Sequence, residues 1–95
     1  MSNREEYIDK MAAKLKEINS EIDKMRAGLE QSQADAKIEY EKQVKDLESN
    51  ASEMQKNLNE LKNAGEQSWD ELRTGVETSW TVLSNSVKNA RERFK

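Results

Sequence analysis

Close pairs of carboxylates are the residues of this sequence that could transfer protons. The pairs are Glu5–Glu6, Glu39–Glu41 and Asp70–Glu71. General acid–base catalysis requires such groups to converge in a cleft that adjusts their proton affinity. Residues that are one or two positions apart on a helix do not face each other, so we interpret these pairs as solvated helix surface.

The sequence lacks the side chains that most often bind metals or act as nucleophiles. The sequence contains no His and no Cys. Helical proteins that bind two irons combine Glu with His, and carboxylates alone in a bundle core are a poor match to such a site. We therefore expect no catalytic residue, no metal site, no cofactor and no enzymatic activity.

Two tryptophans remain as candidate binding residues, and they lie in a repeat of eleven residues. The pattern Ser68-Trp69-x-x-Leu72-x-x-x-Val76 is followed by Ser79-Trp80-x-x-Leu83-x-x-x-Val87. Because eleven residues make almost three helical turns, the repeat predicts one apolar stripe on a nearly straight helix. We call it the C-terminal stripe, and it consists of Trp69, Leu72, Val76, Trp80, Leu83, Val87 and Phe94.

The C-terminal stripe has two interpretations. Its tryptophans would anchor a helical bundle, or they would dock the helix on a membrane surface, where eleven-residue amphipathic repeats also occur. The acidic residues Asp70, Glu71 and Glu77 on the polar face favour the bundle. The basic residues between Lys88 and Lys95 suit either the negative end of a helix dipole or anionic lipid.

An apolar residue at every third or fourth position defines a second surface, which we call the N-terminal seam. It consists of Ile8, Met11, Leu15, Ile18, Ile22, Met25 and Leu29. Such a strict heptad pattern is typical of a left-handed coiled coil. The pattern loosens after Leu29 and recovers between Leu47 and Leu61, and no proline interrupts it. We expect helix along almost the whole chain, as one coiled-coil domain over residues 1–95.

Helix-capping signals set the expected boundaries. The residues SNRE at positions 2–5 have the form of a capping box, which begins a helix at about residue 3. Gly65 suits the left-handed end of a helix, and SWDE at positions 68–71 repeats the capping box. These signals predict a long helix over about residues 3–64, a turn near 64–67 and a short helix over about 68–94.

Two alternatives to these boundaries stay open. Leu61, Gly65 and Trp69 also fit one uninterrupted helix, which would remove the turn. Gly28 is a weaker candidate for a break, since Leu29 keeps the heptad step.

The predicted helix lengths bear on self-association. At 1.5 Å per residue the long helix would extend about 90 Å and the short one about 40 Å. The short helix would cover only the near half of the long one and would leave the N-terminal seam exposed. We therefore expect a homo-oligomer, with a dimer favoured. A monomer that folds back at Gly28 would make similar contacts within one chain, and the dimer would then be its domain-swapped form.

The composition of the chain limits the classes of binding partner and the cellular location that we expect. The chain carries 16 basic and 19 acidic side chains, a net charge of −3, and this gives no nucleic-acid footprint. No run approaches the ~20 apolar residues of a membrane span, and the first residues lack a signal-peptide pattern. We expect a cytoplasmic protein that binds copies of itself or another protein, with a membrane surface less favoured.

The order of these features resembles a known family. Residues 2–11 read SNREEYIDKM, a long charged helix follows, and Trp69-Asp70-Glu71-Leu72 precedes Gly75-Val76 and Trp80. The chain resembles small bacterial coiled-coil proteins that are described as stress-response or coiled-coil domain proteins. The resemblance covers nearly the whole chain and implies an all-α fold and a bacterial cytoplasmic location, with no catalytic residue to carry over.

The sequence as a whole predicts an all-α protein, a long helical hairpin or coiled coil that assembles as a homo-oligomeric bundle. Its expected function is that of a non-enzymatic structural or protein-interaction module, with a stress-associated role implied by the resemblance. The alternative is a peripheral membrane protein that docks the C-terminal stripe on anionic lipid.

Overall fold

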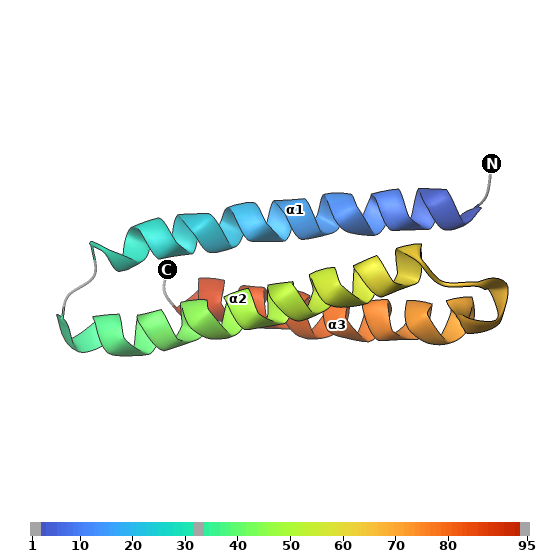
Figure 1. The fold of residues 1–95 in the computed structure, drawn as a ribbon. Helices are drawn as coiled ribbons and strands as arrows, with labels where there is room; N and C mark the ends of the chain where they lie inside the picture. The colour runs from blue at the N-terminus through green and yellow to red at the C-terminus, as the bar shows by residue number, and fades with distance from the viewer. Residues whose placement is uncertain (1–2, 32–33, 94–95) are drawn as a thin grey trace.

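The structure, a computed structural model, describes residues 3–31 and 34–93, which form three helices. Helix α1 spans Asn3–Leu29, α2 spans Ala34–Lys62 and α3 spans Glu66–Arg93. Helix α2 runs antiparallel to both α1 and α3, so α1 and α3 are parallel (Figure 1). The result is an all-α bundle that measures 51 × 19 × 18 Å.

The predicted long helix over residues 3–64 is wrong, because the chain reverses between α1 and α2. The buried residues of α1 end at Ile22, with Met25 packed against them, and those of α2 begin at Val44, with Tyr40 packed against them. The reversal between the helices lets these two apolar faces meet within one chain.

This first reversal does not use a left-handed glycine. Gly28 lies inside α1, and no described residue, glycines included, has a positive φ. The amide of Gln31 donates to the carbonyl of Gly28 at 3.1 Å and closes a tight turn directly after the helix. The alternative in which the chain folds back near Gly28 is therefore the one that the structure adopts.

The second reversal lies between Lys62 and Glu66, close to the predicted turn at 64–67. The expectation of a left-handed Gly65 is wrong, since its φ is not positive. The carbonyl of Gly65 accepts the amide of Ser68 at 3.2 Å, so this glycine belongs to the start of α3 rather than to the end of α2. The short helix predicted from residue 68 therefore begins two residues earlier.

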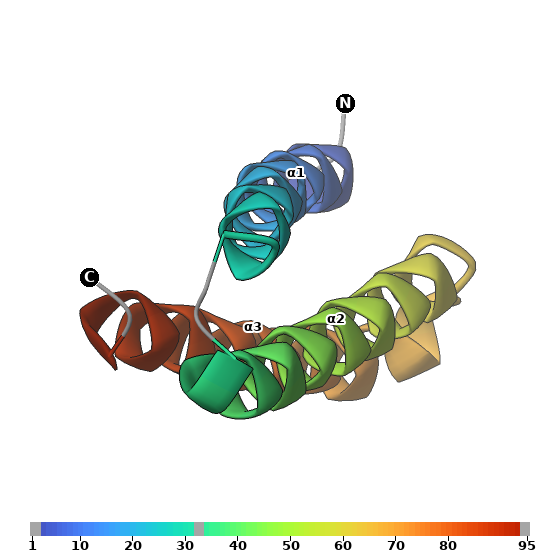
Figure 2. The ribbon, with the colours of Figure 1, turned by 90° about the vertical axis from the view of Figure 1, so that its left-hand side faces the viewer.

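One apolar core joins the three helices. Its buried side chains are Met11, Leu15, Ile18 and Ile22 of α1, Val44, Leu47, Ala51, Met54, Leu58 and Leu61 of α2, and Val76, Leu83, Val87 and Ala90 of α3. Burial of a side chain the size of leucine contributes about 1.5–3 kcal/mol. Helix α1 packs mainly on α2 and much less on α3, and Figure 2 shows it lying over the α2–α3 pair.

The N-terminal seam is part of this core, so the expectation that it is left exposed is wrong. Met11, Leu15, Ile18 and Ile22 are all buried, and Ile18 is the most exposed of them at 8%. Ile8 and Met25 are partly buried against the core, and Leu29 is half-buried. The fold-back of α1 satisfies within one chain the contacts that the sequence assigned to a second copy.

Candidate interaction surface

The C-terminal stripe faces the core along α3. Val76, Leu83 and Val87 are buried, while Trp69, Leu72 and Trp80 are partly buried against them. Phe94, the last residue of the stripe, lies outside the described residues, as does Ser2 of the predicted capping box. Because the stripe is turned inward, contact with a lipid surface would require α3 to separate from the other helices.

Both tryptophans of the repeat are covered by cations from α1. The guanidinium carbon of Arg4 lies 4.8 Å from the centre of the Trp69 ring, and Nζ of Lys14 lies 5.2 Å from the centre of the Trp80 ring. Because α1 and α3 are parallel, cations ten residues apart on α1 meet tryptophans eleven residues apart on α3. Each such contact contributes about 0.5–1 kcal/mol at an exposed site.

Tyr7 adds a third side chain to the Arg4–Trp69 contact. Its ring meets Trp69 edge-on, with centroids 6.1 Å apart and planes at 74°. The Tyr7 hydroxyl is buried and makes no hydrogen bond of acceptable geometry to the described residues. Burial raises the pKa of Tyr7 above its ordinary value of 10.0, and the nearby carboxylate of Glu77 raises it further, partly opposed by Arg73.

Ion pairs join the helices toward the other end of the bundle. Arg26 of α1 pairs with Glu48 of α2, and Arg93 of α3 pairs with Glu39 of α2. Arg91 of α3 donates to a carboxylate oxygen of Glu21 of α1 at 2.6 Å. Each pair of helices thus shares at least one ion pair. Pairs this exposed contribute about 0–1 kcal/mol each, and they occupy Arg91 and Arg93 of the basic segment within the chain.

Helices α2 and α3 are also linked by polar side chains on the flank of the core. Asn50 donates to the Ser86 hydroxyl at 3.5 Å, and Asn57 donates to the Ser79 hydroxyl. The two asparagines are seven residues apart, as are the two serines, so both bonds belong to one antiparallel register. Sequence reasoning missed this link, although the matched seven-residue spacings on the two segments were visible.

The carboxylate pairs lie on the surface, as the sequence predicted. The exposed members are Glu5, Glu6, Glu39, Asp70 and Glu71. Within residues 3–31 and 34–93 no group of three or more acidic side chains is arranged to hold a metal ion.

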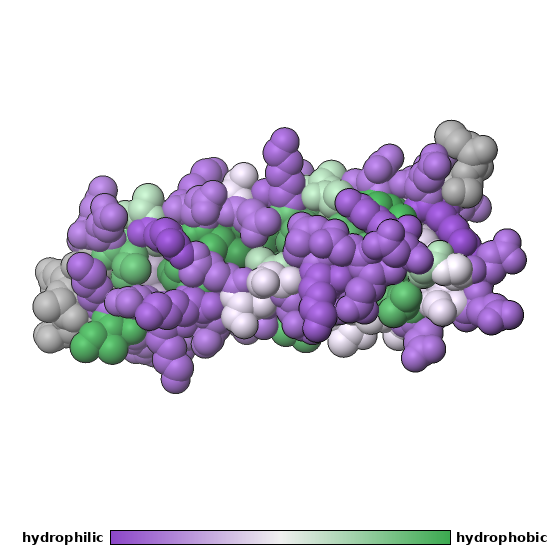
Figure 3. Space-filling view, viewed as in Figure 1, coloured by the Kyte–Doolittle hydropathy of each residue, from purple (hydrophilic) through white to green (hydrophobic). Residues whose placement is uncertain are grey.

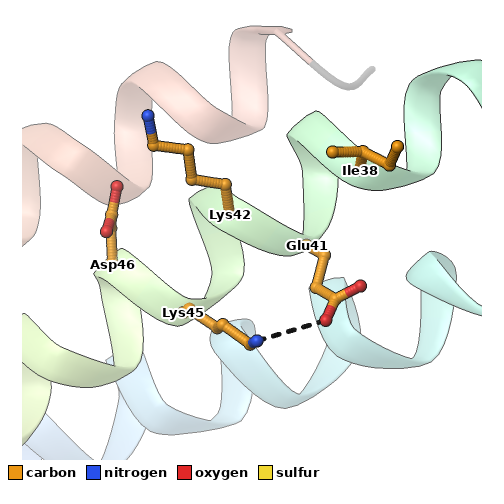
Figure 4. Close-up of a pocket in the computed structure, with 5 residues that line it drawn as sticks. All are labelled: Ile38, Glu41, Lys42, Lys45 and Asp46. Atoms are coloured by element: carbon orange, nitrogen blue, oxygen red, sulfur yellow. Dashed lines mark ion pairs between the residues drawn. The ribbon is translucent and has the colours of Figure 1, made fainter.

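The face of the molecule seen in Figure 3 is mostly hydrophilic, with smaller hydrophobic areas showing between the polar side chains. Among the residues whose burial is described, the exposed large apolar side chains are Ile38 at 79% and Val82 at 49%, neither of which the sequence reasoning singled out. Ile38 borders a hollow on α2, together with Glu41, Lys42, Lys45 and Asp46 (Figure 4). Lys45 and Glu41 pair across one helical turn at 3.3 Å. Because one helix supplies all five residues, the hollow is an open surface.

These features define a small three-helix bundle whose aromatic and charged side chains hold α1 against the α2–α3 hairpin. The chain belongs to DUF6674, a family of unknown function, whose model matches residues 2–93. Comparison with curated proteins gives no significant match, and comparison with solved structures gives none either. The family carries no activity with it, and the three-helix architecture is what the structure shows. Among the described residues, no helix has an apolar stretch long enough to cross a bilayer.

Proposed function

We propose that this protein is a non-enzymatic interaction module that associates with itself through the apolar faces of its helices. One observation carries the proposal: α1 docks its apolar side on the α2–α3 hairpin, yet Ile8, Met25 and Leu29 at the two ends of that side are only partly buried there. A helix-in-groove arrangement of this kind is a common mode of recognition between proteins.

The chemistry of the remaining side chains supports this proposal. The tryptophans contact α1 cations, and the arginines Arg26, Arg91 and Arg93 contact carboxylates on neighbouring helices. These groups therefore position helices. The resemblance to small bacterial coiled-coil proteins supports a cytoplasmic location and a stress-associated role for the module.

The proposal is tested by the mass of the protein in solution. Static light scattering over a hundredfold range of concentration should show a species of twice the 11.0 kDa of one chain. A mass of one chain at every concentration would contradict self-association.

Docking on anionic lipid stays a prediction that no structural observation favours. Co-sedimentation with phosphatidylglycerol vesicles measures it directly. We expect the protein to remain in the supernatant, because the C-terminal stripe is packed against the core.

A further inference from the structure

We infer that two copies of the chain associate through the outer face of α3, with their α3 helices antiparallel across a two-fold axis. This inference rests on the proposed self-association and names its surface. The outer face consists of the uncharged residues that α3 exposes between residues 74 and 90, namely Thr74, Thr78, Thr81, Val82, Asn85 and Asn89. Their spacing places them on the side of the helix opposite the buried residues Val76, Leu83 and Val87.

The outer face of α3 lacks the charges that cover the other two helices. Between residues 74 and 90, only two of the eight exposed residues are charged, Glu77 and Lys88. In α1, and in the part of α2 whose burial is described, nine of fourteen exposed residues are charged. The water-facing side of a helix normally carries charged and polar side chains, whereas the centre of a protein interface is depleted of charge. The composition of this face is therefore that of a contact surface.

Threonine and valine are also unfavourable residues for a helix position that faces only water. Their β-branched side chains lower helix propensity relative to Ala, Lys or Glu. The hydroxyls of Thr74 and Thr81 each donate at 3.0 Å to the backbone carbonyl four residues earlier, so these donors are satisfied within α3. Both threonines then present mainly their methyl groups, next to Val82, which is 49% exposed. The face is therefore more apolar than its residue types suggest.

The distribution of charge along α3 favours a second copy in antiparallel orientation as the partner. Residues 66–73 carry a net charge of −2, and residues 88–93 carry a net charge of +2. An antiparallel partner helix places each acidic end beside a basic end, whereas a parallel one places like charges together. Glu77 and Lys88 are equally far in sequence from the middle of the face, between residues 82 and 83. A two-fold axis at that point brings Glu77 of each copy beside Lys88 of the other.

The proposed interface is small and leaves each bundle intact. The stretch from Thr74 to Asn89 is about 22 Å long at 1.5 Å per residue. Contact of one helix with one helix is at the small end of specific interfaces, so the dimer should dissociate on dilution. Helix α1 stays docked on the hairpin of its own chain, and the contacts of Gly28 with Gln31 and Tyr40 across the first reversal are kept.

Disulfide cross-linking tests this surface, since the chain has no cysteine of its own. Val82→Cys places a thiol beside the proposed two-fold axis, where it meets the thiol of the second copy. Ile38→Cys is the matched control, because Ile38 is the more exposed of the two side chains, at 79%, and lies on α2. Under the same oxidation we expect Val82→Cys to form covalent dimer and Ile38→Cys to remain a single chain.

Charge reversal tests the antiparallel orientation. Lys88→Glu places two acidic groups beside each other in the dimer, so it should lower the dimeric fraction measured by static light scattering. Adding Glu77→Lys to that variant exchanges the two charges and should restore the dimer. Val82→Glu should give the mass of one chain with unchanged helicity, because Val82 is not part of the core.

The outcomes separate this surface from self-association itself. A dimeric mass for Val82→Glu, or equal cross-linking of Val82→Cys and Ile38→Cys, overturns the outer face of α3 and leaves another surface, such as the partly buried ends of the N-terminal seam. Failure of Glu77→Lys to restore the dimer in Lys88→Glu overturns the antiparallel orientation. A mass of one chain for the unmodified protein at every concentration overturns both the surface and the proposed self-association.

Discussion

The hydroxyl of Tyr40 lies against the backbone of Gly28, 3.0 Å from the point where the Cβ of an alanine would stand. Gly28 is in the last turn of α1 and Tyr40 is in the first part of α2, so this approach sits where the chain folds back. Two effects therefore oppose each other when Gly28 is replaced by alanine. The helix gains about 1 kcal/mol of propensity, and the tyrosine must move by a few tenths of an ångström.

We expect Gly28→Ala to change the free energy of unfolding by less than about 0.5 kcal/mol, because the two effects offset each other. In the Tyr40→Phe background the same change should stabilise the protein by about 1 kcal/mol. Urea denaturation of the four proteins in this double-mutant cycle measures both values. Equal effects in the two backgrounds would show that Tyr40 does not restrict Gly28.

Leu58 and Ile38 make a matched pair of large aliphatic residues on α2. Leu58 is 1% exposed in the core, whereas Ile38 is 79% exposed. We expect Leu58→Ala to lower the free energy of unfolding by about 2–5 kcal/mol and Ile38→Ala to change it by less than about 0.5 kcal/mol. Urea denaturation is the measurement. A large loss for Ile38→Ala, accompanied by a fall in solution mass, would indicate that Ile38 is covered by a second copy.

The apolar faces of the helices could be predicted from the sequence because each depends on spacing within one segment. Ile18 and Ile22 were assigned to a helix face by their steps of three and four, and the structure buries both. Val76, Leu83 and Val87 followed in the same way from the eleven-residue repeat. The pattern did not specify which apolar helix face packs against which other face.

The break after Leu29 was missed because the local signals in the sequence were weak. Gly28 does not interrupt the step from Met25 to Leu29, and it turns out to be helical. The apolar spacing gave no signal either, because Leu29 and Tyr40 are eleven residues apart, which is almost three helical turns, so both faces also fit one continuous helix.

Contacts between helices could not be derived from the sequence in the same way. Arg91 has several carboxylates within reach in principle, and its pairing with Glu21 depends on the parallel alignment of α1 and α3. The covering of Trp80 by Lys14 depends on that alignment too. Such pairings become predictable only once the reversal after Leu29 is known.

The tryptophans report on the bundle by fluorescence. Trp69 and Trp80 are partly buried against the core, so their emission should be blue-shifted relative to free indole without any lipid. Adding phosphatidylglycerol vesicles should leave the emission unchanged. If the lipid-free spectrum is that of fully exposed indole and shifts with vesicles, the stripe docks on lipid and the packing of α3 described above does not hold in solution.

The contributions of the Trp80 ring and of the Lys14 charge to stability can be measured separately. Trp80→Ala should lower the free energy of unfolding by about 2 kcal/mol, below the range of about 3–5 kcal/mol for a fully buried aromatic residue. Lys14→Met keeps the aliphatic chain over the ring and removes the charge, and it should lower the free energy of unfolding by about 0.5–1 kcal/mol. Urea denaturation measures both. In the Trp80→Ala background, Lys14→Met should have no effect, and an unchanged loss there would contradict the contact.

Tyr7 links the stability of the bundle to alkaline pH. Its pKa is raised, first by burial and then by Glu77, so the folded protein favours the neutral phenol more than the unfolded chain does. This contribution is fully present below the ordinary pKa of 10.0 and is lost as the pH rises through the raised value in the folded state. Tyr7→Phe should therefore reduce the loss of stability above about pH 10, measured by urea denaturation at successive pH values.

Two further comparisons separate the causes of this alkaline loss. Near pH 7, Tyr7→Phe should stabilise the protein by up to about 1 kcal/mol, because it removes a buried hydroxyl that has no hydrogen-bond partner among the described residues. Glu77→Gln should reduce the alkaline loss only in part, since burial is the larger cause of the raised pKa of Tyr7. If Tyr7→Phe loses as much stability at alkaline pH as the unmodified protein does, the Tyr7 hydroxyl is open to water.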